Sequence, residues 1–237
     1  MNSSPAPLPA APSTPGAPAD NTRRSRRKDA RPGELLDAAL DLFVEKGFAA
    51  TRVEEVAARA GVSKGTLFLY FPSKIELFKA VVRHNIAGRF DEWREEMRDF
   101  DGSSCELLRH CFTVWWQRIG ATKVSGITKL ILSEAGNFPE LAQFYRQEVI
   151  AVGQELIRNI LQRGMASGEF RAIDLDYAIY LVIAPMIFLM TWRHSIGMCV
   201  PDALGLTPEE FIAVQVDNLL LRLCTRPVPA PTSSCTP

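Results

Sequence analysis

Two closely spaced helix starts between residues 48 and 78 limit the fold of this chain more than any other feature. Thr51, with a glutamate three residues later, matches a capping box and predicts a short helix. Gly61 then allows a sharp turn, and Ser63 is placed to cap a second helix that ends just before Pro72. Two such short helices joined by a tight turn predict a helix-turn-helix.

Apolar residues recur at helical spacing through the rest of the chain, and no segment alternates with the period of two that strands require. The sequence therefore predicts an all-α protein. A first helix is expected from about Pro32 to Lys46, ended by Gly47, and a capping box at Ser73 opens a longer helix toward Met97. Further helices are expected at 105–119 and 124–135, from 138 to about 168, from Asp174 and from Thr207.

These elements predict an N-terminal three-helix helix-turn-helix domain followed by a C-terminal helical domain. The expected boundaries are 1–29 for a disordered Pro/Ala-rich tail with a basic arm, 30–90 for the helix-turn-helix domain with its motif at about 52–71, 91–225 for the C-terminal domain and 226–237 for a disordered tail. The first twenty residues lack both the basic start and the apolar stretch of a secretory signal.

The charges are balanced overall but unevenly distributed. The chain has 27 basic and 27 acidic residues, of which the first 90 positions hold 14 and 9. A basic N-terminal part joined to an acidic C-terminal part predicts that contact with a polyanion belongs to the first domain.

Several function classes are excluded by what the sequence lacks. The five cysteines form no C-x-x-C pair and have no neighbouring histidines, so neither a zinc site nor a disulfide framework is indicated. A glycine-rich phosphate loop and a nucleophile motif are also missing, so we expect no enzyme and no cofactor. A reducing cytoplasm is the expected setting, and thiol redox sensing stays open as a minor alternative.

The second helix of the motif is predicted to enter the major groove of DNA. It begins with a hydroxyl cap and carries basic and aromatic residues on its outer side, where its amides and side chains can meet phosphates and base edges. The outward candidates are Lys64, Gly65, Thr66, Phe68, Leu69 and Tyr70. Two alternatives remain open: Phe68 and Leu69 as core residues, and Lys64 and Thr66 as solvated helix positions.

The same block resembles the TetR family of transcriptional regulators over roughly residues 30–86. The matching residues are Gly47-Phe48, Thr51, Val56-Ala57, Ala60-Gly61-Val62-Ser63, Gly65-Thr66-Leu67, Tyr70-Phe71, Ser73-Lys74 and Leu77-Phe78. The resemblance implies a three-helix DNA-binding domain, a linking fourth helix and a C-terminal domain for ligand binding and dimerisation.

The resemblance also implies roles for individual residues. It puts Thr51 and Arg52 near the DNA backbone, Ser63 at the helix cap, Lys64, Gly65 and Thr66 toward bases or phosphates, Phe68, Leu69 and Tyr70 at the groove wall and Lys74 on a phosphate. Phe68 departs from the family, which usually has a tyrosine there, so an apolar contact replaces a hydroxyl contact. Upstream, Arg23, Arg24, Arg26 and Arg27 either form a solvated segment or contact DNA as an arm.

The C-terminal domain is predicted to hold a small apolar effector. Its segment from Leu132 to Leu141 resembles a stretch common in TetR-like regulators. Aromatic and sulfur-containing side chains could line an apolar pocket or simply form core, and the candidates are Phe112, Trp115, Trp116, Ile119, Tyr145, Met186 and Met190. His110 and His194 are expected at the surface or in hydrogen bonds.

The run Ala178–Trp192 is apolar on all sides and is shorter than the roughly 20 residues of a membrane span. It contains Pro185 and has charged flanks, so we predict a buried helix at a subunit interface, with no membrane contact. The predicted homodimer interface consists of Ile183, Ile187, Ile212, Val216, Leu219, Leu220 and Leu223.

Together these features predict a dimeric repressor that leaves a palindromic double-stranded DNA operator when a small apolar effector binds. An effector-independent DNA-binding or protein-docking module is the alternative. Activation in place of repression stays open, as do the operator sequence, the target genes and the effector.

Overall fold

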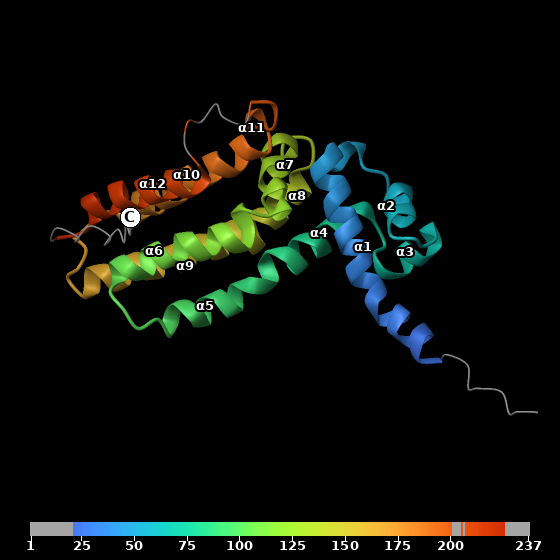
Figure 1. The fold of residues 1–237 in the computed structure, drawn as a ribbon, viewed down its shortest axis with the longest axis horizontal. Coiled ribbons are helices and arrows are strands. Elements are labelled where there is room, and N and C mark those ends of the chain that lie inside the picture. Colours follow the sequence, from blue (N-terminus) through green and yellow to red (C-terminus); the bar gives the residue numbers. More distant parts are fainter. Residues whose placement is uncertain (1–20, 201–204, 206, 226–237) are drawn as a thin grey trace, which may run out of the picture.

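The computed structural model describes residues 21–200, 205 and 207–225, with side chains from Pro32 onward. Every regular element in these residues is a helix, which confirms the all-α prediction, and an isolated bridge joins Phe170 to Cys224. Helices α1–α4 form one end of the molecule, and α5–α12 form an elongated stack that extends away from it (Figure 1).

The N-terminal part consists of α1 (Asn21–Ala50), α2 (Val53–Arg59), α3 (Lys64–Tyr70) and α4 (Lys74–Asn85). The C-terminal part consists of η1 (Ala87–Arg89), α5 (Phe90–Arg98), α6 (Ser104–Trp115), η2 (Trp116–Gly120), η3 (Lys123–Ser125), α7 (Gly126–Glu134), α8 (Pro139–Tyr145), η4 (Arg146–Ile150), α9 (Ala151–Ala166), α10 (Leu175–Arg193), α11 (Ile196–Cys199) and α12 (Pro208–Leu223).

Helix α1 begins earlier than the sequence predicts. Its backbone is helical from Asn21, so the segment that holds the basic run lies within the helix, and contact of this run with DNA stays a prediction. The side chains of Arg23, Arg24, Arg26 and Arg27 lie outside the described residues. At the other end the helix stops regular winding at Gly47, as predicted, because its φ of 82° and ψ of 171° suit only glycine.

The turn between α2 and α3 follows from local chemistry. Gly61 has a φ of 67°, its amide bonds to the carbonyl of Ala58, and the amide of Val62 bonds to the carbonyl of Ala57. This is the glycine-terminated helix end in which two free carbonyls find partners. The Ser63 hydroxyl then accepts a hydrogen bond from the Thr66 amide at 3.0 Å, which confirms the predicted cap of α3.

Helix α4 is shorter than predicted. The Ser73 hydroxyl caps it by accepting from the Glu76 amide at 3.1 Å, but the helix ends at Asn85 and does not reach Met97. Ile86 leaves the helical conformation with a φ of −127°, and a short 3₁₀ turn separates α4 from α5. The chain therefore bends where the N-terminal part meets the rest.

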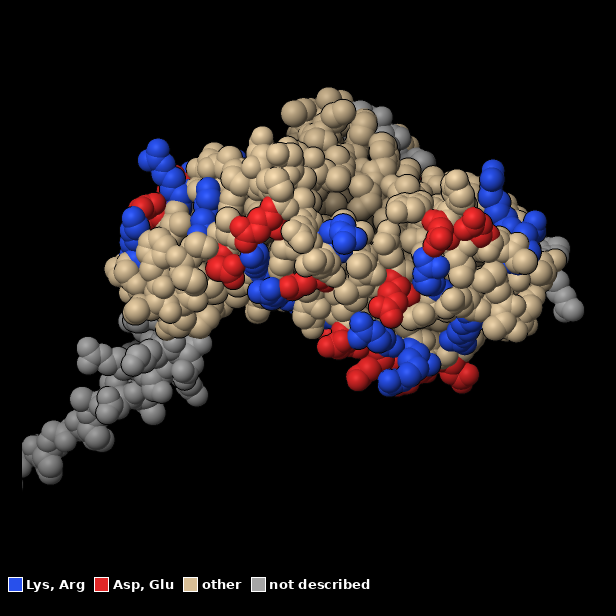
Figure 2. Space-filling model, turned by 180° about the vertical axis from the view of Figure 1, so that it is seen from behind, with Lys and Arg blue, Asp and Glu red and all other residues tan. Residues whose placement is uncertain are grey.

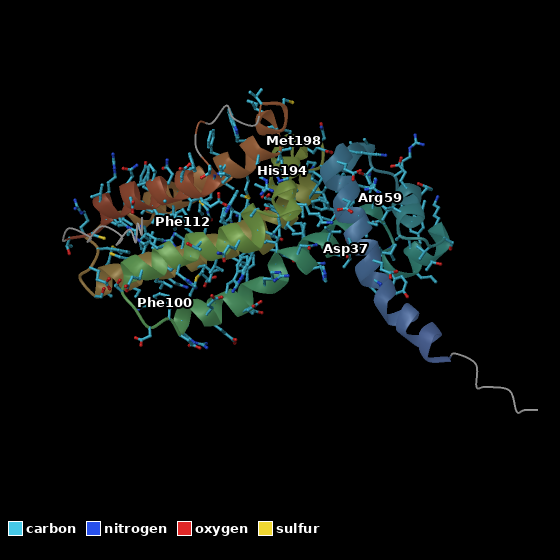
Figure 3. All side chains as sticks on the ribbon, viewed as in Figure 1. Asp37, Arg59, Phe100, Phe112, His194 and Met198 are labelled. Carbon is cyan, nitrogen blue, oxygen red and sulfur yellow. The ribbon has the colours of Figure 1, made fainter. Side chains whose placement is uncertain are left out.

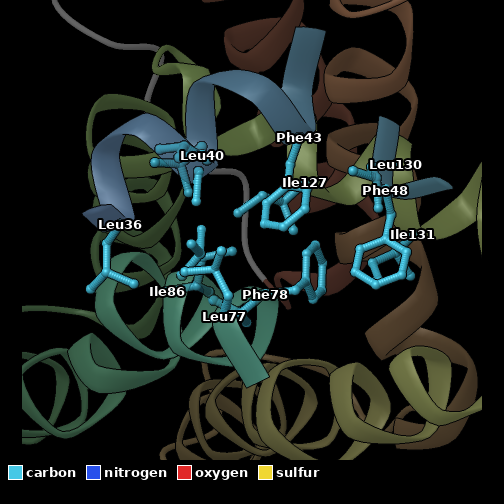
Figure 4. Close-up of a cluster of buried hydrophobic side chains, with 14 of the residues drawn as sticks. Leu36, Leu40, Phe43, Phe48, Leu77, Phe78, Ile86, Ile127, Leu130 and Ile131 are labelled. Carbon is cyan, nitrogen blue, oxygen red and sulfur yellow. The ribbon is translucent and has the colours of Figure 1, made fainter. Parts of the chain in front are cut away.

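The N-terminal core extends into the C-terminal part without a break. Figure 4 shows side chains of α1 and α4 packed with those of α7, including Leu40, Phe78 and Ile127. Phe43, Phe48 and Phe78 form a cluster of aromatic rings with centroid separations of 5.3 to 5.7 Å. The helix-turn-helix thus rests on a frame built by both parts.

A second core joins α6, α9, α10 and α12, and it corrects the predicted dimer interface. On α12, Ile212, Val216, Leu219, Leu220 and Leu223 are all buried inside this core. Helix α12 is apolar on more than one side, and the wide apolar stripe formed by these residues packs on other helices of the same protomer. Ile183 and Ile187 are partly buried and line an internal cavity of the C-terminal part.

The apolar side chains that α10 and α12 expose are not those predicted for the dimer interface. They are Tyr177, Tyr180, Leu181, Phe188, Val214 and Leu221, and two of them, Tyr177 and Leu221, are 76% and 70% exposed. By length and composition alone, Leu175–Cys199 could cross a membrane, so the length of the apolar run does not by itself exclude a span. A third of its most apolar 18-residue window is buried, and Ile179, Val182 and Met186 on α10 belong to the second core.

Candidate nucleic-acid interface and effector cavity

Helix α3 packs on the core with one side and exposes the opposite side to solvent. Leu67 is fully buried in the core, and the partly buried Val62 packs against the same cluster. Phe68, Leu69 and Tyr70 are 38%, 85% and 37% exposed. The alternative that Phe68 and Leu69 are core residues is therefore wrong, and their side chains are free to meet a partner.

The polar groups of α3 are arranged around its first turn. Gly65 is exposed, and the Thr66 hydroxyl lies 2.9 Å from the Ser63 hydroxyl. The ammonium of Lys64 pairs with Glu54 at 2.6 Å and lies 5.7 Å from the centre of the Phe68 ring. Both members of the ion pair are more than half exposed, so the lysine can exchange this partner for a phosphate at little cost in free energy.

Acidic residues neutralise most of the basic ones on this domain. Lys46 pairs with Glu55 at 3.0 Å, and Arg59 pairs with Glu45 at 2.8 Å. Positive and negative side chains also intermingle on the face of the molecule shown in Figure 2. Arg52 is exposed at the start of α2, and we found no ion pair for it among the described residues. The described part of the domain therefore has no continuous basic patch.

Thr51 does not occupy the predicted position near the DNA backbone. Its side chain is 1% exposed, and its hydroxyl donates to the carbonyls of Leu42 at 3.1 Å and Gly47 at 2.7 Å. Arg52 is the residue that precedes α2 as its N-cap. The hydroxyl turns back to α1 because the bend at Gly47 brings the carbonyls of Leu42 and Gly47 within its reach.

The geometry of Lys74 indicates a structural role in place of the predicted phosphate contact. Its ammonium donates to the carbonyls of Phe48, Ala49 and Thr51 at 2.7, 3.1 and 3.0 Å. It also lies 4.5 Å from the centre of the Phe48 ring. Partial burial lowers the pKa of this ammonium, while Glu134 opposes the shift. All three of its donors hold residues 48–51, which follow the kink of α1 at Gly47 and are called the loop before α2 below.

Glu134, at the end of α7, is a residue that the sequence reasoning missed. Its carboxylate accepts from the backbone amides of Phe48 at 2.6 Å and Ala49 at 2.8 Å. The same two residues offer their carbonyls to Lys74. The loop between α1 and α2 is therefore held by a charge from the C-terminal part and a charge from α4.

An apolar cavity of about 180 Å³ lies in the C-terminal part. The residues that line it include six of the seven predicted pocket residues: Phe112, Trp115, Ile119, Tyr145, Met186 and Met190. Figure 3 shows Phe112 among the C-terminal helices, well away from Arg59 at the helix-turn-helix end. Trp116 is the exception, since its indole nitrogen donates to Glu209 at 2.9 Å and its ring belongs to the second core.

The lining connects the cavity to the N-terminal part. Ile86, which follows the last residue of α4, borders it, and so does Thr128 of α7. None of the lining residues is charged. The lining residues that carry a polar group in their side chain include Trp93, Cys111, Thr128 and Tyr145.

Comparison with known proteins identifies both parts of the chain. Residues 35–81 match the family model for bacterial regulatory proteins of the tetR family, and residues 102–196 match the tetracyclin repressor-like C-terminal domain. The transcriptional repressor KstR2 of Mycolicibacterium smegmatis is 30% identical over 211 residues, which cover 88% of this chain and 95% of that protein.

Two other proteins resemble this chain less completely. The transcriptional activator FasR of the same organism is 41% identical over 83 residues, covering 34% of this chain and 38% of that protein. The crystal structure of the regulator FadR from Bacillus subtilis in complex with stearoyl-CoA has a TM-score of 0.56 at 19% identity and covers 80% of this chain and 95% of that one.

The structural neighbour supports the fold, and the family models and the full-length relative support the function. A helix-turn-helix with an exposed second helix is joined to a helical domain with an internal cavity. This chain therefore belongs to the TetR family of helix-turn-helix transcriptional regulators.

Proposed function

We propose that this protein is a repressor that binds a palindromic DNA operator as a homodimer and leaves it when a small apolar effector enters the cavity. The observation that carries the proposal is the position of α4. Its side chains Leu77, Phe78 and Val81 are buried in the helix-turn-helix core, and Ile86 directly after it borders the cavity. A molecule in the cavity therefore touches the end of the helix that supports the DNA-binding motif.

The repressor role is supported by the relative that matches nearly the whole chain. KstR2 is named a repressor, whereas the activator FasR matches over 83 residues only. The stearoyl-CoA complex of FadR supports an effector with an apolar part. A regulator of DNA acts in the cytoplasm of a bacterium, which agrees with the setting expected from the free thiols.

Base reading in this proposal depends on apolar contacts more than on hydrogen bonds. Leu69 is the most exposed large apolar side chain of α3, and a thymine methyl is the group in the major groove that it suits. The amides at the start of α3 and Lys64 are available for phosphates. The DNA backbone contacts that we predicted for Thr51 and Lys74 are replaced by their role in fixing the loop before α2.

The homodimer forms through the exposed apolar side of α10 and α12 in this proposal. These two helices pack against each other and present Tyr177, Tyr180, Leu181 and Leu221 to the outside. Exposed apolar patches of this kind mark protein interfaces. We expect Leu221→Glu to give a monomer in sedimentation velocity and Leu132→Glu, an exposed leucine on α7, to leave the dimer intact.

DNA binding is tested by fluorescence anisotropy with duplexes from the upstream region of the gene. The wild type should bind one duplex selectively, and its affinity should fall as salt rises. Leu69→Ala should reduce the preference for that duplex over random DNA about tenfold, the order of one base contact. Leu132→Ala is the matched control and should bind as the wild type does. A wild type without selective, salt-sensitive binding contradicts the proposal.

The basic run has its own test. Deleting residues 1–28 should flatten the dependence of log affinity on log salt by about 0.9 for each phosphate that the arginines of this run neutralise in the wild type. An unchanged slope would show that Arg23, Arg24, Arg26 and Arg27 are solvated and bind no DNA.

The effector part is tested by filling the cavity. Gly153 lines it, and a Cβ at this position would meet no atom within 4 Å. Gly153→Leu should abolish the rise in melting temperature that neutral apolar compounds give the wild type, while DNA binding is kept. Gly136→Leu, at a glycine outside the cavity where a Cβ also meets no atom within 4 Å, is the control. A wild type that no apolar compound stabilises would favour the effector-independent module.

A further inference from the structure

One of the residues that line the cavity has a buried hydrogen-bond donor without an acceptor. Trp93 of α5 borders the cavity and is 5% exposed. Its indole nitrogen is buried and has no hydrogen-bond partner among the described residues. Buried polar groups are nearly always paired, so an orphaned donor at the wall of a cavity indicates a partner that arrives with a ligand.

A second unused proton lies at the same cavity. The hydroxyls of Thr128 and Tyr145 are 3.1 Å apart, and both residues are buried. Burial raises the pKa of the Tyr145 phenol, so this group keeps its proton. One hydroxyl donates to the other, and the second proton has no acceptor among the hydrogen bonds of the described residues.

The residues that line the cavity also restrict the charge that a ligand inside it can carry. None of the lining residues is charged, so a carboxylate or an ammonium inside the cavity would have no counter-ion. A buried charge without a partner is far more unfavourable than a buried neutral acceptor that receives a hydrogen bond. The lining therefore selects a neutral molecule, and its unused N–H and O–H groups select one with an acceptor oxygen.

We propose that the effector is a neutral, largely hydrocarbon molecule with a carbonyl-type oxygen that accepts a hydrogen bond from the Trp93 indole. The unused hydroxyl proton of the Thr128–Tyr145 pair is available to the same oxygen or to a second one. This inference depends on the proposed function because it assumes that the cavity is the effector site.

The test compares three probes of equal chain length by titration calorimetry on the full-length protein. They are 2-undecanone, which is neutral and has an acceptor, 1-undecene, which has none, and undecanoate, which is charged. In a site without donors, the ratio of the ketone dissociation constant to that of the alkene would equal the ratio expected from their partition between water and an alkane. In the wild type this ratio should be much closer to one, and undecanoate should bind more weakly than the ketone.

Trp93→Phe keeps an aromatic ring and removes the donor. It should raise the ratio of the ketone dissociation constant to that of the alkene about five- to tenfold, the usual effect of one hydrogen bond. Trp115→Phe changes the same residue type in the same cavity and should leave the ratio unchanged. Because only the ratio is compared, a general weakening of packing in either variant cancels.

The outcomes separate this inference from the proposed function. An unchanged ratio in Trp93→Phe, or undecanoate bound as tightly as the ketone, overturns the inference while the apolar effector site stands. If neither neutral probe binds the wild type, the proposed effector and this inference fail together. A higher ratio in the double variant Thr128→Val/Tyr145→Phe together with an unchanged ratio in Trp93→Phe would assign the acceptor to the hydroxyl pair and overturn the role given to Trp93.

Discussion

The contact of Glu134 with the loop before α2 predicts a measurable decrease in stability when its charge is removed. The carboxylate accepts from the amides of Phe48 and Ala49 at 2.6 and 2.8 Å, although Glu134 lies 86 and 85 residues further along the chain. Glutamine at this position keeps one oxygen, so Glu134→Gln removes one of the two bonds and the charge. Glu134→Ala removes both bonds.

The magnitude follows from the number and the exposure of these bonds. A hydrogen bond to a charged group contributes about 1.5–3 kcal/mol when it is buried. The Phe48 bond is partly buried and the Ala49 bond is exposed, so the lower end applies. We expect a decrease in the free energy of unfolding of about 1–2 kcal/mol for Glu134→Gln and about 2–3 kcal/mol for Glu134→Ala.

Urea denaturation of the purified protein measures this effect, and Glu140→Gln is its control. Glu140 pairs with Lys79 at 2.7 Å, but its side chain is 59% exposed, so the decrease should be at most about 1 kcal/mol. If Glu134→Ala is no less stable than Glu140→Gln, the two amide contacts do not stabilise the fold. A shift confined to the control would also refute the reasoning.

Three further predictions concern single residues. Gly47→Ala should destabilise the protein by about 2–3 kcal/mol in urea, because its φ of 82° suits only glycine and a Cβ would meet the Glu134 carboxylate, whereas Gly136→Ala should have little effect. Burial lowers the pKa of His194 below 6.5, so the unfolded chain binds a proton at this residue more readily than the folded protein does. The free energy of unfolding should therefore fall as the pH drops from about 7.5 to about 5.5, and His194→Gln should remove the part of this pH dependence that the imidazole causes. Burial raises the pKa of the Cys111 thiol to about 12, so peptide mapping after iodoacetamide at about pH 8 should find it unmodified while the exposed Cys199 is alkylated; a modified Cys111 in the folded protein would contradict its burial.

Helix caps were the part of the fold best predicted from the sequence. The hydroxyls of Ser63 and Ser73 each accept from an amide three residues later, as predicted, and side-chain caps at Asp174 and Thr207 start the helices expected there. These contacts are local, so the chain around each cap decides the geometry. Thr51 matches the same pattern but does not cap α2, because a hydroxyl can also donate, and the bend at Gly47 brings the carbonyls of Leu42 and Gly47 to it.

The faces of the C-terminal helices could not be predicted in the same way. Periodicity shows that α12 is apolar, but it does not say which side packs on the protomer and which side is left over. The stripe through Val216 and Leu220 is buried, whereas Val214 and Leu221 next to it are exposed. Only the packing of α12 against α6 and α10 separates the two sides, and that packing is not local.

Six of the seven predicted pocket residues line the cavity, and the reason is a different one. A large aromatic or methionine side chain on an apolar helix is either core or cavity wall, and in this chain most of the chosen residues are both. Phe112 and Met186 belong to the second core and border the cavity as well. Trp116 differs because Glu209, 93 residues away, accepts its indole proton and fixes the ring in another place.

Glu134 shows what such long-range contacts mean for function. The carboxylate at the end of α7 holds the amides of the loop before α2, and Thr128 on the same helix borders the cavity. Ile86, directly after α4, also borders the cavity, so α4 and α7 both connect the cavity to the support of the DNA-binding motif. A ligand that shifted only α4 or only α7 would strain the loop before α2. Lys74 of α4 and Glu134 of α7 both bind Phe48 and Ala49 of this loop. We therefore expect the position of α3 to depend on α4 and α7 moving together, and the orientation of the helix-turn-helix to respond to what the cavity contains.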